Sequence, residues 1–146
     1  MPPSGTDTNK LALRRALEAY ARGEVEPIKA LASDHIVWTT NAMPGHYRFG
    51  GKHSGRAGMT ESLAIIAAEY AITRYVVREM VAEGDVIWTT VDFGAIYRKS
   101  GAKVDVTLVS RWQFAEGKIV AFTEFFDSAG TLSQLGRLPE SFVTAG

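Results

Sequence analysis

The C-terminal half of the chain contains four β-rich segments that are separated by very short joints. The joints are Glu83-Gly84-Asp85, Ser100-Gly101 and Glu116-Gly117. Each has a glycine where a tight hairpin needs a positive φ angle, so consecutive strands are expected to pair antiparallel. Because long hairpin strands twist, this pattern predicts a strongly curved antiparallel sheet. Its strands are expected at residues 72–83, 85–98, 102–114 and 118–127.

The N-terminal half instead shows helical spacing of apolar residues. Leu13, Ala16, Leu17 and Tyr20 form one stripe of a helix that begins near residue 7 and that Gly23 ends. Further elements are expected as a short helix at 24–32, a strand at 35–40, a loop at 41–55, a helix at 54–71 and a last helix at 128–135. We therefore predict one α+β domain over residues 1–146, with flexible ends at 1–6 and 139–146. Its curved sheet forms a cone, and helices packed in the mouth of the cone enclose one apolar pocket.

Composition argues against several classes of function. Lys plus Arg and Asp plus Glu both number 16, so no bulk field favours nucleic acid or a membrane surface. The absence of cysteine excludes disulfides and thiolate chemistry. Three histidines without carboxylates at ligand spacing make a poor metal site, and we expect no cofactor. No apolar run approaches the roughly 20 residues of a membrane span, so a cytoplasmic protein is expected.

Four short motifs, in this order, carry a resemblance to a known superfamily. They are Gly23-Glu24-Val25-Glu26, Ile36-Val37-Trp38, Gly84-Asp85-Val86 and Glu116-Gly117-Lys118-Ile119-Val120. From about residue 10 to residue 136 the chain resembles the nuclear transport factor 2-like superfamily. Within it, the chain looks most like the SnoaL-like polyketide cyclases and the ketosteroid-isomerase-related proteins. The resemblance implies a cystatin-like α+β barrel and a homodimer that forms through the convex faces of the sheets. It also implies a small hydrophobic molecule as the ligand.

The roles that ketosteroid isomerases need are vacant in this chain. The position of the carboxylate base falls near Asn41, and that of the oxyanion tyrosine falls near Ala16. The position of the second acid falls on Ser110 or Arg111. We therefore do not expect ketosteroid isomerase activity.

Limonene-type epoxide hydrolases are a closer match. Asp92, Asp127 and Asn41 stand where that family has two aspartates and an asparagine, as the resemblance implies. The arginine position of that family is Thr90 and its tyrosine position is Thr39. In the polyketide cyclases the acid that matches Asp127 is the general base.

Hairpin register decides which side chains share a face. With a two-residue Ser100-Gly101 loop, Arg111 lies opposite Thr90 and can pair with Asp92 inside the pocket, and Val104, Leu108 and Trp112 then point outward. A three-residue loop would turn Arg111 to the other face. The length of the loop before Lys118 leaves a similar choice. A three-residue loop puts Asp127 on the face of Arg111, and a two-residue loop puts Glu124 there. The resemblance favours Asp127, and Glu124 is the alternative.

Two kinds of function remain open. The first is a general acid/base enzyme, of the cyclase, isomerase or hydrolase type, that acts on a small apolar oxygenated molecule. The second is a non-catalytic ligand-binding or dimerisation module, in which Asp127 only caps a helix and Asp92 only forms a salt bridge. The candidate catalytic residues are Asp127, Asp92, Arg111 and Asn41. The candidate substrate-binding residues are Trp38, Tyr20, Tyr47, Trp88, Thr90, Phe125 and Glu124.

Overall fold

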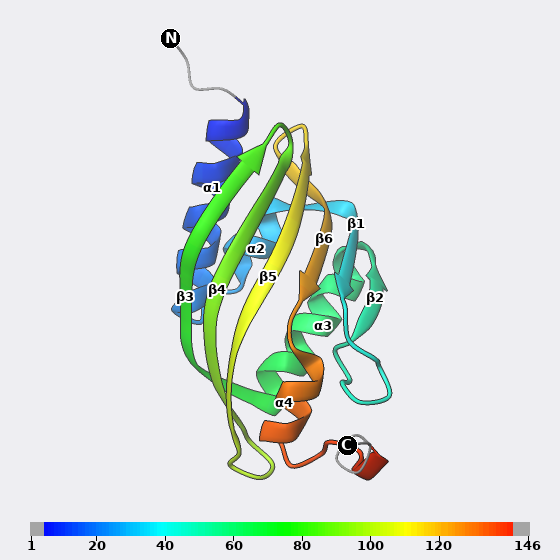
Figure 1. Cartoon of the computed structure of the whole chain (residues 1–146). Coiled ribbons are helices and arrows are strands. Elements are labelled where there is room, and N and C mark those ends of the chain that lie inside the picture. The colour runs from blue at the N-terminus through cyan, green and yellow to red at the C-terminus, as the bar shows by residue number, and fades with distance from the viewer. Residues whose placement is uncertain (1–4, 142–146) are drawn as a thin grey trace.

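A computed structural model describes residues 5–141, which form a six-stranded curved sheet with helices packed against it (Figure 1). The strands are β1 (Ala32–Thr40), β2 (Gly51–Ser54), β3 (Tyr70–Glu83), β4 (Val86–Tyr97), β5 (Lys103–Ala115) and β6 (Lys118–Phe125). The helices are α1 (Gly5–Ala21), α2 (Glu26–Leu31), α3 (Gly55–Glu69) and α4 (Ser128–Gln134). The predicted α+β class and the cone of curved sheet are confirmed, although the sheet is not closed into a barrel.

The sheet has the strand order β2-β1-β6-β5-β4-β3. The three predicted hairpins join β3 to β6 in antiparallel pairs, but β1 pairs with β6 in parallel, so the expectation of an all-antiparallel sheet is wrong. The segment expected to be a loop at 41–55 contains the edge strand β2, which pairs antiparallel with β1. Local turn signals reveal hairpins but carry no information about the pairing of strands far apart in the sequence.

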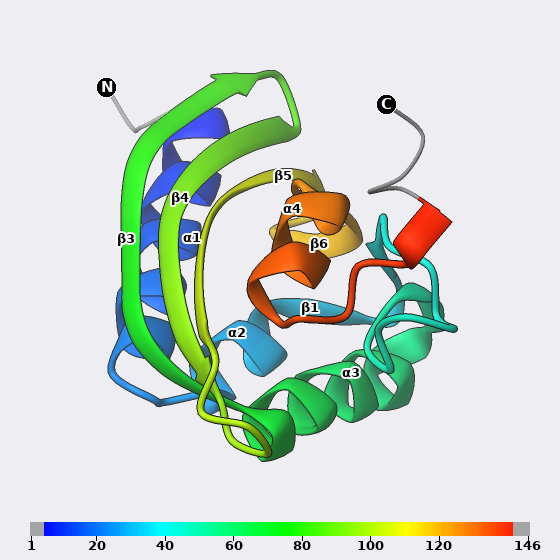
Figure 2. The same cartoon turned by 60° about the horizontal axis from the view of Figure 1, so that its bottom comes forward.

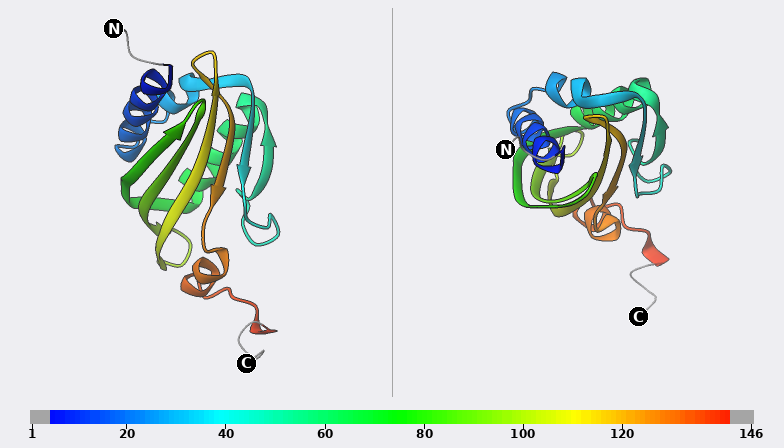
Figure 3. Two further views of the ribbon diagram at one scale, coloured as in Figure 1. Left: turned by 45° about the horizontal axis from the view of Figure 1, so that its top comes forward. Right: turned by 90° about the horizontal axis from the view of Figure 1, so that it is seen from above.

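Bulges add to the curvature that strand twist produces. The β3–β4 register shifts between Ile72 and Arg74 and again between Val77 and Glu79. Each bulge inserts a residue into one strand and bends it. The sheet is therefore strongly curved, as the view from above in Figure 3 shows.

The helices cover the concave side of the sheet. Helix α1 buries Leu13 and Leu17 and packs on β3 and α2, whereas α3 packs on β1 and β2. Because α1 begins at Gly5, the last part of the expected flexible segment 1–6 is helical; residues 1–4 and 142–146 lie outside the described part of the chain. In residues 5–141, no helix is both long and apolar enough to cross a membrane.

Two separate clusters of apolar residues form the core. The first lies among α1, α2, α3 and the sheet and includes Leu13, Ile36 and Phe114. The second lies near α4 and includes Tyr70 and Leu132. The helices and sheet hold these clusters apart, and the space between them is the site described next.

Candidate active site in the interior of the cone

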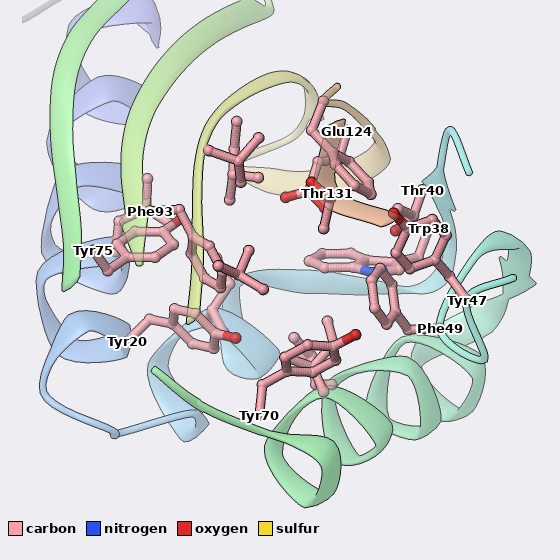
Figure 4. A pocket seen from close by; sticks show the side chains of 18 of the residues that line it. Tyr20, Trp38, Thr40, Tyr47, Phe49, Tyr70, Tyr75, Phe93, Glu124 and Thr131 are labelled. Carbon is pink, nitrogen blue, oxygen red and sulfur yellow. The ribbon is translucent and has the colours of Figure 1, made fainter. Parts of the chain in front are cut away.

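A cavity lies between the two core clusters. Its wall is almost entirely apolar and aromatic (Figure 4). The volume of the cavity that the centre of a water-sized sphere can occupy is about 80 Å³. This is several times the roughly 10–15 Å³ that one buried water needs. It is lined by Leu17, Tyr20, Ile28, Trp38, Thr40, Tyr47, Phe49, Leu63, Ile66, Tyr70, Tyr75, Phe93, Val104, Val106, Leu108, Trp112, Glu124, Phe126 and Thr131. The cavity therefore has room for a small, mostly apolar molecule.

Strand β5 supplies one wall of the cavity through its even-numbered residues. Val104, Leu108 and Trp112 are buried and face the interior, so the prediction that they point outward is wrong. The Trp112 indole donates a hydrogen bond to the Thr89 hydroxyl over 3.0 Å, which satisfies its N–H group without using the cavity. The odd-numbered residues of β5 consequently face the convex side.

Among the described residues that line the cavity, Glu124 is the one with an acidic side chain. It lies opposite Ser110 on β5, and its side chain points inward from β6. Within residues 5–141, no hydrogen bond or ion pair engages its carboxyl group, although its backbone oxygen accepts from Asn41 over 2.8 Å. Burial in this apolar setting raises the pKa of Glu124 to about 7. This carboxyl can therefore both accept and donate a proton near neutral pH.

A bulge explains why Glu124 rather than Asp127 faces the cavity. The β5–β6 turn is a two-residue loop, and both Glu116 and Gly117 adopt positive φ angles, as a type I′ turn requires. The register then shifts between Gln113 and Phe114, so Arg111 lies opposite Thr123. Because of this one-residue shift, Glu124 lies opposite Ser110 and faces the concave side. Thr123, which lies opposite Arg111, faces the convex side.

Four tyrosines bring hydroxyl groups to the cavity wall. Burial is the main cause of a raised pKa in all of them, to about 12 in Tyr47 and Tyr70, and the negative charge of Glu124 contributes in Tyr20 and Tyr75. The Tyr47 hydroxyl donates to the backbone oxygen of Ser128 over 2.6 Å. Tyr20 and Tyr70 direct their hydroxyls toward the middle of the cavity (Figure 4). Because their pKa values lie above the ordinary range, these phenols stay protonated at neutral pH and can donate hydrogen bonds.

The predicted pair between Arg111 and Asp92 inside the pocket does not exist. The β4–β5 loop spans four residues, 98–101, so Arg111 lies opposite Trp88 rather than Thr90. A difference of two residues keeps Arg111 on the face of Asp92, as predicted, but this face is the convex one. Arg111 donates to the Gln113 side chain over 3.1 Å.

Asp92 instead belongs to an ion-pair cluster on the convex face. It accepts from Arg74 and from Arg78, each over 3.0 Å, and Arg74 also reaches Asp105 over 2.7 Å. The hydrogen bonds from Arg78 and Arg74 lower the pKa of Asp92. The carboxylate is therefore held ionised at the surface, and a catalytic role for it in the cavity is ruled out by its position.

Three predicted substrate-binding residues also lie on the convex face. Trp88 is 41% exposed and stacks on Phe125, which is 37% exposed, with ring centroids 6.4 Å apart. The Thr90 hydroxyl donates to Glu79 over 3.3 Å. Trp88 and Thr90 do not line the cavity, because β4 presents its odd-numbered residues to the interior, and Phe125 does not, because it lies opposite the outward-facing Val109 of β5.

Asp127 is the N-cap of α4. Its carboxylate accepts from the backbone N–H of Gly130 over 2.9 Å, and it is exposed. Asn41 is also exposed at the end of β1, outside the cavity wall. The prediction that these two residues lie in the pocket is therefore wrong, and the predicted helix-capping role of Asp127 is confirmed.

Removal of the Asp127 cap is expected to affect stability alone. Asp127→Ala should lower the free energy of unfolding by about 1 kcal/mol, whereas Asp127→Asn should change it by only a few tenths, because asparagine also caps helices well. Urea denaturation of the two variants and the wild-type protein measures the difference. Equal stability of Asp127→Ala and the wild type would contradict the capping role.

Loss of the Arg111 side chain is expected to be mild. Arg111→Ala leaves no buried carboxylate unpaired, so the free energy of unfolding should change by no more than about 0.5–1 kcal/mol. Urea denaturation tests this value. A loss above about 3 kcal/mol would indicate a buried ion pair that the convex position of Arg111 excludes.

Four of the residues predicted to bind substrate, Trp38, Tyr20, Tyr47 and Glu124, do lie in the cavity wall. The sequence does not predict Tyr70 and Tyr75 as site residues, although both lie near the start of β3 and line the cavity. The direction of the β5 side chains, in contrast, is indicated by the sequence, because the even-numbered residues of this strand are mostly apolar and the odd-numbered residues mostly polar. That alternation identifies the buried face.

Comparison with known proteins gives a consistent picture of the fold. The sequence model of the SnoaL-like domain matches residues 13–122. An NTF2-like protein of unknown function from Burkholderia pseudomallei superimposes with a TM-score of 0.80 at 21% identity, over 87% of this chain and 96% of that one. A candidate isomerase from Rhodopseudomonas palustris gives a TM-score of 0.77 at 21% identity, over 94% and 100%. TerC, co-crystallised with polyporic acid, gives 0.78 at 21% identity, over 88% and 98%. No curated protein matches the chain.

Proposed function

Because this chain belongs to the SnoaL-like domain family, we propose that it is a general acid/base enzyme acting on a small, mostly apolar, oxygenated molecule. The observation that carries this proposal is the Glu124 carboxyl, which is buried in an apolar cavity without a partner among the described residues and has a pKa of about 7. A carboxyl that serves only structure would be expected to have a partner. A general base with a pKa near the working pH is the most effective one.

The reaction that fits the cavity is proton transfer at a carbon next to a carbonyl group. Ionised Glu124 removes the proton, the carbon–hydrogen electron pair forms the enolate, and the carboxyl group returns the proton at the same or another atom. The protonated phenols of Tyr20 and Tyr70, which point into the cavity (Figure 4), would donate hydrogen bonds to the enolate oxygen. Isomerisation and ring closure both begin with this step. The description of one similar structure as a candidate isomerase agrees with this class of reaction.

A binding protein without turnover is the second candidate. It is favoured by the position of Asp92, which is held in ion pairs on the convex face, so the acid–arginine set of the epoxide hydrolases is missing from the cavity. In that case the cavity would hold its ligand and Glu124 would only hydrogen-bond to it.

Deuterium exchange into an enolisable aryl ketone separates the two candidates. We expect the protein to accelerate the exchange of the C1 protons of 2-tetralone in D₂O, which proton NMR measures. The rate should saturate with ketone concentration. As the pH increases, the rate should rise to a plateau with an apparent pKa near 7. A protein that binds 2-tetralone but leaves the exchange at the buffer rate would be a binding protein.

We also propose that the protein forms a homodimer through the convex face of its sheet. Val81, Trp88 and Phe125 are exposed there at 62%, 41% and 37%, and a second sheet would cover them. Sedimentation should give a dimer at tens of micromolar for the wild type and a monomer for Trp88→Lys. A monomeric wild type at that concentration would contradict the proposal.

A further inference from the structure

A polar recess adjoins the apolar cavity. Its lining residues come from the β1–β2 loop, the β4–β5 hairpin, the end of α3 with the start of β3, and the segment around the end of α4; Figure 2 shows where these elements lie. The recess is lined by His46, Tyr47, Arg48, Glu69, Tyr70, Tyr97, Lys99, Ser100, Leu135 and Arg137. Tyr47 and Tyr70 line both the recess and the cavity, so the two spaces meet at these rings. A bound molecule could therefore extend from the interior into the recess.

The recess carries an excess of positive charge. Among the described residues, its lining has three cationic side chains, which belong to Arg48, Lys99 and Arg137, and one acidic side chain, which belongs to Glu69. Glu69 is paired with Arg48 over 3.4 Å, whereas Lys99 and Arg137 form no ion pair within residues 5–141. The charges of Lys99 and Arg137 are thus available to a ligand.

The position of Arg137 places its charge where the two spaces meet. Its guanidinium donates to the backbone oxygen of His46 over 2.7 Å, which holds the side chain across the recess. Its positive charge counteracts the effect of burial on the pKa of both Tyr47 and Tyr70. Arg137 therefore lies close to both rings at the junction.

We propose that this recess binds the carboxylate group of a molecule whose apolar ring body occupies the cavity. The interior cannot hold that group, because its wall is apolar and Glu124 would repel a second negative charge. Guanidinium and ammonium groups at the junction bind carboxylates through charge-assisted hydrogen bonds. If the proposed base role of Glu124 is right, on which this assignment of a substrate rests, the substrate is an aromatic or alicyclic keto acid with its carboxylate at the recess and its reacting carbon inside.

A pair of ligands that differ only in charge tests the proposal. Calorimetric titration at pH 7.5 and low salt should show that 2-naphthoate binds at least fivefold more tightly than the neutral 2-naphthamide. The preference should shrink to less than twofold at 0.5 M salt, where exposed charges are screened. Equal affinity for the two ligands, or no measurable binding of 2-naphthoate, would overturn the proposal.

Variants of the recess separate a direct role from a structural one. Arg137→Gln and Lys99→Gln should each weaken 2-naphthoate binding three- to tenfold and change 2-naphthamide binding less than twofold. Arg78→Gln removes the same charge from the convex face and should leave both affinities unchanged. An equal loss for both ligands in Arg137→Gln would mean that the residue only shapes the recess, and would overturn its assigned role.

The same titration in Glu124→Gln distinguishes this proposal from the proposed function. The preference for 2-naphthoate should persist in Glu124→Gln, because the recess is unchanged. A preference that persists while deuterium exchange is absent in the wild type refutes the base role and keeps the recess. Exchange without any preference refutes the recess and keeps the base role.

Discussion

Glutamine in place of Glu124 is expected to lower the rate of deuterium exchange into bound 2-tetralone at least a hundredfold. General base catalysis by a positioned side chain typically contributes 10²–10⁴-fold, and glutamine cannot accept the proton. Glutamine has nearly the same shape as protonated glutamate, so the cavity and its ligand affinity should be preserved. Proton NMR of the exchange at saturating ketone, with binding measured separately, gives the two quantities.

Two further carboxamide variants serve as matched controls. Asp92→Asn and Asp127→Asn each remove one carboxylate outside the cavity, from the convex face and from the N-terminus of α4. Both should exchange 2-tetralone at a rate within about twofold of the wild-type rate, because neither side chain reaches the ligand. Exchange by Glu124→Gln at the wild-type rate would remove Glu124 from the mechanism, and a large loss in Asp127→Asn would return the base role to Asp127.

The part of the fold that is encoded in local signals could be predicted from the sequence. The hairpin glycines, such as Gly117 with its positive φ angle, and the apolar stripe that includes Leu13 and Leu17 specify their elements through neighbours close in the chain. The parallel pairing of β1 with β6 and the edge strand β2 could not be predicted in this way. The parallel pairing depends on contacts between segments about 85 residues apart, and β2 lies within a loop rich in glycine.

The site was harder to predict because a strand has two faces and small changes in register exchange them. The bulge next to Phe114 turns Glu124 inward, and the sequence of the turn Glu116-Gly117 does not indicate this bulge. The strand alternation correctly predicts that Arg111 and Asp92 share one face, but the resemblance to the epoxide hydrolases favours the inner face, whereas the structure places both residues on the outer one. The polar character of the odd-numbered positions on β5 argued for the outer face, and here the physical pattern was the better guide.

The buried carboxyl of Glu124 should also make the protein less stable as the pH rises toward neutrality. Its pKa is about 7 in the folded protein against an ordinary value of 4.5, so the folded state binds the proton more tightly than the unfolded state does. Between these two values the folded chain carries more bound protons, and the free energy of unfolding falls as pH increases. The contribution is fully present below about pH 4.5 and lost above about pH 7, and 2.5 pH units correspond to up to about 3 kcal/mol.

Glu124→Gln should therefore be more stable than the wild type at pH 8 by up to about 3 kcal/mol, and about equally stable at pH 4.5. Urea denaturation of both proteins from pH 4.5 to pH 8 measures this difference, in which the titration of all other groups cancels. Glu61→Gln is the matched control, because it makes the same change at an exposed position on α3, outside the cavity. Its stability difference from the wild type should not depend on pH. A Glu124→Gln curve that runs parallel to the wild-type curve would show that Glu124 is ionised at little cost in the folded protein. It would remove the shifted pKa on which the proposed base role depends.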